Sequence, residues 1–159
     1  MLKGAMMEFK SRAIRSLLEL HDAELRAFLA TWRRYARAGV PMPDAHGDED
    51  YENIDRLGTH VLKGARGYLV RITGWLGRPA ADLDMADDVE DLTARADEFA
   101  ESLLDAYKRH LSSATDEEMS AWVHKTRQGN SISIEMLLEH AVVHPMRHRV
   151  QLERILAEN

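Results

Sequence analysis

Apolar residues recur at intervals of three and four along most of this chain, which is the spacing of a helix that buries one face. Four segments show this pattern, over about residues 8–38, 54–75, 92–111 and 134–156. Glycine and proline interrupt the pattern after the first two segments, and residues 112–133 form the least regular stretch. No segment alternates polar and apolar positions, so strands have little support.

Four helices that each carry one apolar stripe bury those stripes most economically against one another. The pattern therefore predicts an all-α fold, an antiparallel four-helix bundle with a long irregular loop before the last helix. A chain of 159 residues without an internal repeat is most simply a single domain over residues 1–159. In the irregular loop, Thr115 and Glu118 have the spacing of a capping box, and the last helix should begin near Ser131 or Ser133.

Composition narrows the functional classes. The chain has no cysteine, which rules out disulfides and thiolate ligands and fits a reducing compartment. The net charge of -6 argues against nucleic acid as a partner. No apolar stretch is long enough for a membrane span or a signal-peptide core, so we expect a cytoplasmic protein with no membrane partner.

Three histidines in the last segment, His140, His144 and His148, are spaced four apart, with Pro145 among them. On a helical wheel His144 and His148 border the apolar stripe, and His140 lies farther out. Two imidazoles at this spacing can present ring nitrogens to one divalent metal ion. The same spacing also arises by chance or serves packing, so a metal site needs a third ligand from another helix.

The second segment offers that ligand. His60 lies on the margin of its apolar stripe, on the same face as Gly64, Gly67 and Arg71. Glycines there cost helix stability, so they either leave room for a bound group or admit a bulky neighbour such as Trp32. Arg71 could receive an anionic group of a substrate.

Two further residues bear on the site. His21 lies near the centre of the first stripe, where it is either a hydrogen-bonded core residue or faces the same site, as a fourth ligand or as a hydrogen-bond partner of the ligands. Pro145 disfavours helical geometry, yet the apolar stripe keeps its phase from Ile134 to Ile155. We therefore predict a kinked but continuous last helix.

With these residues identified, the chain resembles the DinB family, a group that includes thiol-dependent transferases and mycothiol-dependent maleylpyruvate isomerases. The resemblance covers nearly the full length, and its most specific part is the stretch HPMRHRVQ, from His144 to Gln151. Val150 replaces the usual glycine of the family, and Pro145 is not typical. The resemblance implies a divalent transition metal, nickel or zinc, held by His60, His144 and His148.

Three histidines leave coordination positions open, and an open site can activate a water or a thiol near neutral pH. We therefore expect a metal-dependent enzyme with a small-molecule substrate. The resemblance favours thiol-dependent transferase chemistry with a low-molecular-weight thiol; metal-assisted hydrolysis is the other option, although the chain has no HExxH glutamate. Arg71 and Arg149 are candidates to hold a substrate carboxylate, and the sequence identifies no catalytic residue.

An alternative from another class is a stress-associated, metal-binding bundle without catalysis that acts through dimerisation. Apolar residues on the helix flanks, such as Val142 and Leu104, would then form the interface of a homodimer.

Overall fold

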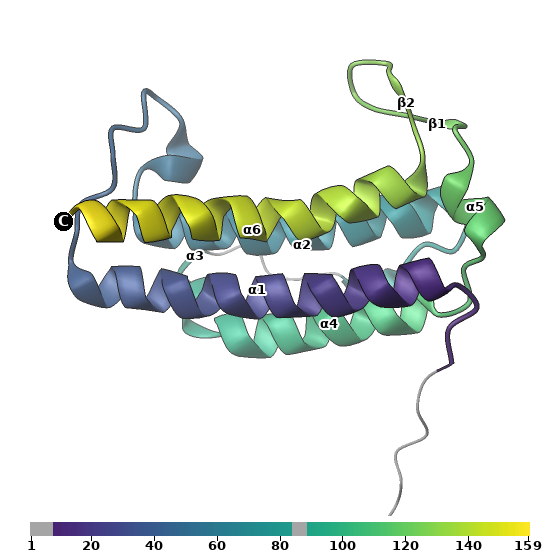
Figure 1. Cartoon of the computed structure of the whole chain (residues 1–159), viewed down its shortest axis with the longest axis horizontal. Helices are drawn as coiled ribbons and strands as arrows, with labels where there is room; N and C mark the ends of the chain where they lie inside the picture. The colour runs from purple at the N-terminus through teal and green to yellow at the C-terminus, as the bar shows by residue number, and fades with distance from the viewer. Residues whose placement is uncertain (1–7, 84–88) are drawn as a thin grey trace, which may run out of the picture.

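The computed structural model describes residues 8–83 and 89–159. Helices dominate the described chain, and the predicted all-α bundle is confirmed (Figure 1). The four long helices are α1 (Arg12–Ala38), α2 (Ile54–Trp75), α4 (Ala96–Leu111) and α6 (Ile134–Glu158).

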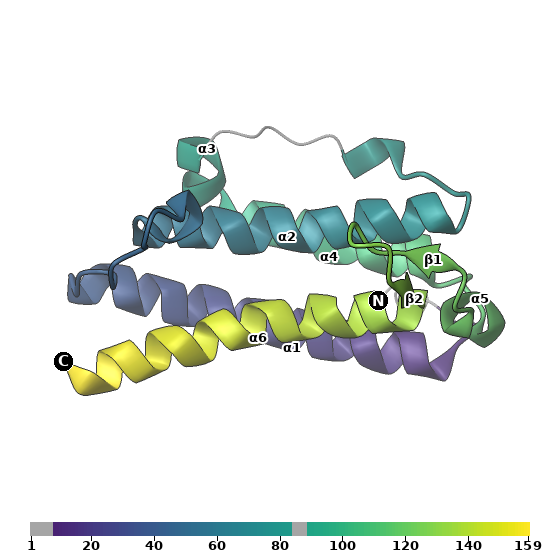
Figure 2. The same cartoon turned by 90° about the horizontal axis from the view of Figure 1, so that it is seen from above.

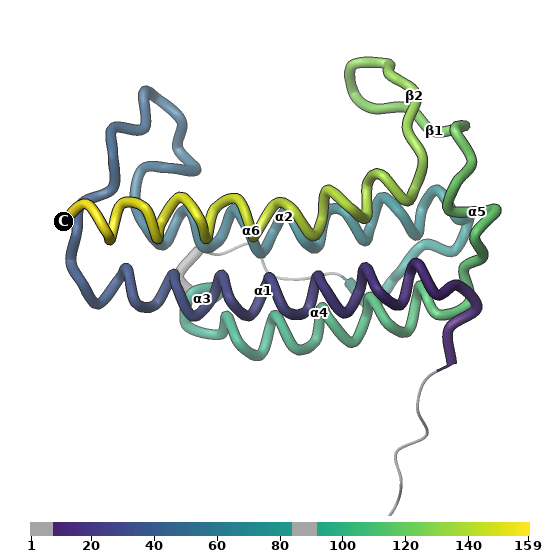
Figure 3. The backbone as a smooth tube through the Cα atoms, viewed as in Figure 1, coloured from purple at the N-terminus to yellow at the C-terminus, as the bar shows by residue number. Residues whose placement is uncertain are grey.

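The direction of each helix determines which residues meet. Helices α1 and α6 run one way along the bundle, and α2 and α4 run the other way (Figure 1, Figure 3). Helix α6 packs most extensively against α1 and also against α2. The short helix α3 (Val89–Ala94) begins at the opposite end of the bundle from the end of α2 (Figure 2). Because α2 and α6 run in opposite directions, the first half of α2 lies beside the middle and second half of α6.

Side-chain caps fix where the helices begin. The side-chain oxygens of Ser11, Asn53 and Ser133 each accept a hydrogen bond from a backbone N–H in the first turn of α1, α2 and α6. Ser133, one of the two predicted starts, is thus the cap of the last helix. The predicted capping box of Thr115 and Glu118 is present and begins the short helix α5 (Asp116–Ser120).

The third apolar segment contains a break that the sequence did not predict. Helix α3 ends at Ala94 and α4 begins at Ala96, with Arg95 in a non-helical conformation between them. Leu92 and Ala96 are both buried on either side of this break. Because they keep helical spacing, the apolar stripe continues across the break and hides it.

The sequence pattern gave strands little support, yet the structure contains two short ones. Strands β1 (His124–Lys125) and β2 (Ser131–Ile132) pair as a small antiparallel hairpin in the irregular loop. Its turn contains Gly129 at a φ of 83°, a conformation that favours glycine. Two-residue strands are too short to produce a visible alternation of polar and apolar positions.

Helix α6 runs through Pro145 without interruption, as the continuous apolar stripe predicted. The proline is buried between His144 and His148. Helical geometry across this position keeps the two histidines one turn apart on one face.

The bundle buries its apolar stripes in one core. Two buried polar groups tie the helices together: the Tyr107 hydroxyl donates to the Ala65 carbonyl at 2.6 Å, and the Trp32 indole donates to the Ile54 carbonyl at 2.8 Å. Val142 and Leu104 are buried in this core. The dimer interface expected from these two residues is therefore wrong, because neither side chain lies on the surface.

Candidate metal centre

The three histidines predicted as ligands lie together between α2 and α6. His60 is in the second turn of α2, and His144 and His148 face it from α6. The ring centroid of His60 is 4.9 Å from that of His144 and 5.4 Å from that of His148. The centroids of His144 and His148 are 4.9 Å apart. One nitrogen from each ring lies within 4.8 Å of the others. The rings are therefore close enough to share one ion.

The nitrogens of this cluster fit a cation. His60 Nε2 and His144 Nε2 are 3.0 Å apart, so either one donates a hydrogen bond to the other or both direct lone pairs at the same ion. His148 Nε2 is buried, and the described chain supplies no hydrogen-bond partner for it. An unpaired buried nitrogen costs about 1–3 kcal/mol, a cost that coordination of a metal removes.

Two oxygen acceptors orient the rings from outside the cluster. Asp50, in the 3₁₀ helix η1 (Glu49–Tyr51), places Oδ2 2.9 Å from His60 Nδ1. Gln151 places Oε1 3.3 Å from His148 Nδ1. An ionised carboxylate only accepts hydrogen bonds, so His60 Nδ1 donates, and in the neutral imidazole the lone pair is then on Nε2. Such outer contacts are typical of metal-binding histidines.

Burial keeps two of the three rings neutral at pH 7. Burial, with the neighbouring imidazoles His148 and His60 as weaker causes, lowers the pKa of His144 to about 3. Burial also lowers the pKa of His148 to about 4, against the opposing effect of the hydrogen bond to Gln151. Neutral imidazoles have the lone pairs that a transition metal requires.

A glycine makes room for the buried ring of His144. A Cβ atom added at Gly64 would lie 2.9 Å from His144 Cε1, closer than real contacts allow. Gly67 has nothing within 4 Å of such an atom, and the glycine that admits Trp32 is Gly58. Of the two glycines predicted to leave space on this face, Gly64 therefore does so, for a histidine of the cluster.

The two arginines predicted to bind substrate lie elsewhere. Arg149 forms ion pairs with Glu24 at 3.2 Å and Glu153 at 3.1 Å, between α6 and α1. Arg71 is exposed and lies about 16 Å farther along the α2 axis than His60. The structure does not bring either guanidinium to the three histidines.

His21 is also separate from the cluster. Its side chain is fully buried, and its ring contacts Tyr107 of α4 at a centroid distance of 4.5 Å. Neither ring nitrogen has a hydrogen-bond partner among the described residues. Burial lowers its pKa to about 4. His21 is thus a core residue, but without the expected hydrogen bond, and it makes no ring contact with the three clustered histidines.

Sequence reasoning missed several residues around the cluster. The ring of Tyr51 lies 5.9 Å from that of His60 and 5.7 Å from that of His148. The positive charge of Arg147 helps to lower the pKa of both His144 and His148. A helical wheel could have found Arg147, because it falls on the face of α6 that carries the histidines. Asp50 and Tyr51 lie in the short helix η1, which is too short to show an apolar periodicity.

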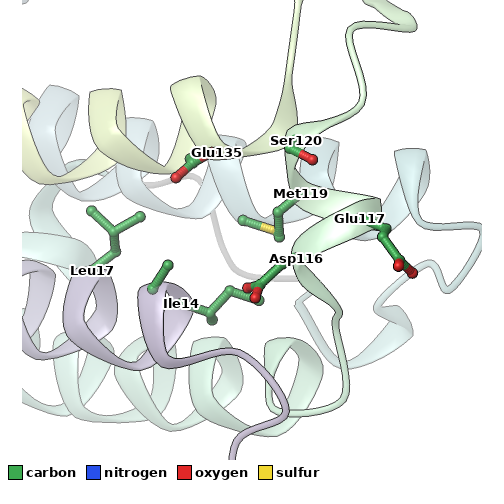
Figure 4. A pocket seen from close by; sticks show the side chains of 8 residues that line it. Ile14, Leu17, Asp116, Glu117, Met119, Ser120 and Glu135 are labelled. Atoms are coloured by element: carbon green, nitrogen blue, oxygen red, sulfur yellow. The ribbon is translucent and has the colours of Figure 1, made fainter.

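An open pocket of about 660 Å³ adjoins the cluster, and Tyr51 and Gln151 both line it. A different pocket lies among α1, α5 and α6, lined by the carboxylates of Asp116, Glu117 and Glu135 beside apolar residues (Figure 4). No histidine lines either pocket, but Tyr51 and Gln151 of the first pocket contact rings of the cluster. The first pocket is therefore the one that adjoins the candidate metal centre.

Fold and site together define a class: a helical bundle whose second and last long helices hold a three-histidine cluster suited to a divalent metal. The model of the DinB family matches residues 42–158, and the chain belongs to this family. The matched region contains all three histidines. No curated protein and no solved structure matches the chain. Across residues 8–83 and 89–159, no helix is both long and apolar enough to cross a membrane.

Proposed function

We propose that this protein is a divalent-metal-dependent enzyme acting on a small molecule, with His60, His144 and His148 as the ligands of nickel or zinc. The observation that carries the proposal is the buried Nε2 of His148, which has no partner in the described chain and lies in a cluster of converging ring nitrogens. A single unpaired buried nitrogen would be a defect of packing. Here it lies within 4.8 Å of ring nitrogens of His60 and His144, from two helices beside an open pocket, and together they make a site that a ligand can complete.

The residues around the cluster have distinct roles in this proposal. Asp50 and Gln151 accept hydrogen bonds from His60 and His148 and so fix which nitrogen of each ring faces inward. Tyr51 covers the same two rings and limits access of water. A metal held here would act as a Lewis acid that polarises a bound group and lowers its pKa.

Thiol-dependent group transfer fits the site better than hydrolysis. In transfer, the sulfur of a thiol forms a bond to an electrophilic carbon, while the leaving group departs with the electron pair and the thiol proton. The chain has no cysteine, so the thiol would be a separate small molecule. Hydrolysis would require a general base to take a proton from water. Asp50 is the carboxylate beside His60, but it already accepts a hydrogen bond from that histidine.

The alternative of a stress-associated bundle without catalysis has less support. Val142 and Leu104, which were expected to form its homodimer interface, are both buried. The open pocket beside the cluster is a feature of enzymes and ligand-binding proteins. A cytoplasmic location remains our expectation from the cysteine-free composition.

The test combines metal analysis with turnover. Purified protein is loaded with nickel or zinc, and consumption of glutathione or cysteine is followed with a panel of small electrophiles. We expect turnover in proportion to bound metal, its loss in His148→Ala, and its retention in His140→Ala, which changes an exposed histidine of the same helix. Stoichiometric metal without turnover across the panel would favour the bundle without catalysis, and absence of metal would overturn the site.

A further inference from the structure

The pocket beside the candidate metal centre has a positively charged wall. Arg147, Gln151 and Arg154 line it from α6. Their spacing of four and three places them on one face of the helix, which is the face that carries the histidines. Tyr51 lines the pocket from η1 and contacts two of the clustered rings. The wall of the pocket is therefore continuous with the histidine cluster.

The two guanidinium groups of this wall are available to a ligand. In the described part of the chain, no carboxylate pairs with Arg147 or Arg154, and no acidic residue lines the pocket. Arg149, on another face of the same helix, is held by two glutamates. Two such uncompensated cations, about two turns apart on one face of α6, are unusual in a protein of net charge -6, because acidic side chains are abundant enough to pair with them.

The remaining lining residues are apolar. They are Pro43, Val150 and Ile155. Val150 is 44% exposed, a large apolar surface for a residue of a packed helix. The volume of about 660 Å³ lies in the range of small-molecule sites, roughly 300–1,000 Å³. Cationic and apolar surfaces in one pocket of this size suit a small molecule that has an anionic end and a hydrocarbon body.

We propose that this pocket binds the carboxylate of a small organic acid through Arg147 and Arg154, with the apolar part of the acid against Val150 and Ile155. The inference rests on the proposed function in one respect: the bound acid is the substrate or co-substrate of the metal centre. Arginine suits this role because its planar fork can donate two parallel hydrogen bonds to one carboxylate. Binding there places the rest of the acid next to Tyr51 and the histidines.

Binding can be tested without metal and without activity. The full chain, stripped with a chelator, is titrated with hexanoate, 1-hexanol and inorganic phosphate, and backbone amide chemical shifts are followed by NMR. We expect hexanoate to shift the amides of residues 147–155 and to bind about tenfold more tightly than hexanol, since a charge-assisted hydrogen bond contributes about 1.5–3 kcal/mol. Equal binding of hexanol would overturn the carboxylate site. Tighter binding of phosphate would overturn the organic acid as its ligand.

Variants separate this pocket from the metal centre. Arg147→Gln and Arg154→Gln should each weaken hexanoate binding about tenfold. Arg34→Gln, which changes an exposed arginine on α1, should leave it unchanged. Unchanged affinity in both pocket variants would overturn the proposal. His148→Ala should lose metal and keep hexanoate. In the unsubstituted protein, absence of metal with retained hexanoate binding would refute the proposed function and not this pocket.

Discussion

His21 and His148 are both completely buried, and burial lowers the pKa of each to about 4. Their surroundings differ. His148 has Gln151 on one ring nitrogen, and two further imidazoles lie within 5.5 Å of its ring centroid. His21 has the ring of Tyr107 and no hydrogen bond among the described residues. The comparison teaches that burial makes an imidazole neutral, but only convergence with other ligands makes it part of a site.

The largest expected effect separates the two histidines directly. His148→Ala should lower the affinity for nickel or zinc by more than about 100-fold, since even outer contacts of a metal site contribute about 10–100-fold. His21→Leu should leave that affinity unchanged. Isothermal titration with each metal measures both. Equal losses in the two variants would show that His21 belongs to the site.

The pH dependence of stability should come partly from His21. Its pKa is about 4 in the folded protein and about 6.5 when unfolded, so the unfolded chain binds more protons between these values. The contribution of His21 is therefore complete above pH 6.5, declines as the pH falls, and levels off below about 4. Between pH 7 and 5 it should remove about 2 kcal/mol from the free energy of unfolding.

Urea unfolding of the metal-free protein at pH 7, 6 and 5 checks this value against His21→Leu. The variant should show a shallower dependence on pH, because one proton fewer binds on unfolding. The same slope in both proteins would contradict a neutral, buried His21.

A glycine tests how closely the cluster is packed. Gly64→Ala should weaken metal binding about tenfold, because the added methyl group meets the ring of His144. Gly67→Ala is the matched control, since the added methyl group meets nothing within 4 Å. The control should stabilise the helix by about 0.5–1 kcal/mol and keep metal affinity. An equal effect of Gly64→Ala and Gly67→Ala on metal affinity would contradict this prediction.

The smallest expected effect concerns His21 at neutral pH. His21→Leu should raise the free energy of unfolding by about 1 kcal/mol, because it removes a buried ring without hydrogen bonds and nearly keeps its volume. Chemical unfolding at pH 7.5 measures the change. A loss of several kcal/mol would mean that the contact with Tyr107 stabilises the fold more than the unpaired nitrogens destabilise it.

The sequence predicted the parts of this protein that depend on regular helices. The period of the apolar stripes gave the four long helices, and helical spacing with the family resemblance gave His60, His144 and His148. It missed the break at Arg95, where the stripe stays in phase, and the hairpin, whose strands are two residues long. The sequence also missed Asp50, because this residue lies outside the four long helices and reaches His60 only through the fold of its segment.

The arginines show a second limit of the sequence. Arg147 and Arg149 are two positions apart, so their side chains point about 160° apart around α6. Arg149 meets Glu24 of α1, whereas Arg147 lies on the side of the histidines. Which arginine is neutralised depends on the neighbouring helix, and the sequence alone does not show which helix that is.

His60 and His144 are 84 positions apart in the chain, and their Nε2 atoms meet. A cation held between them would act as a reversible cross-link that closes this long loop and fastens the last helix to the second. A ligand that binds only the folded form stabilises the protein against unfolding by mass action. Metal loading would thus protect the C-terminal helix from proteases, coupling the lifetime of the protein to the supply of the ion.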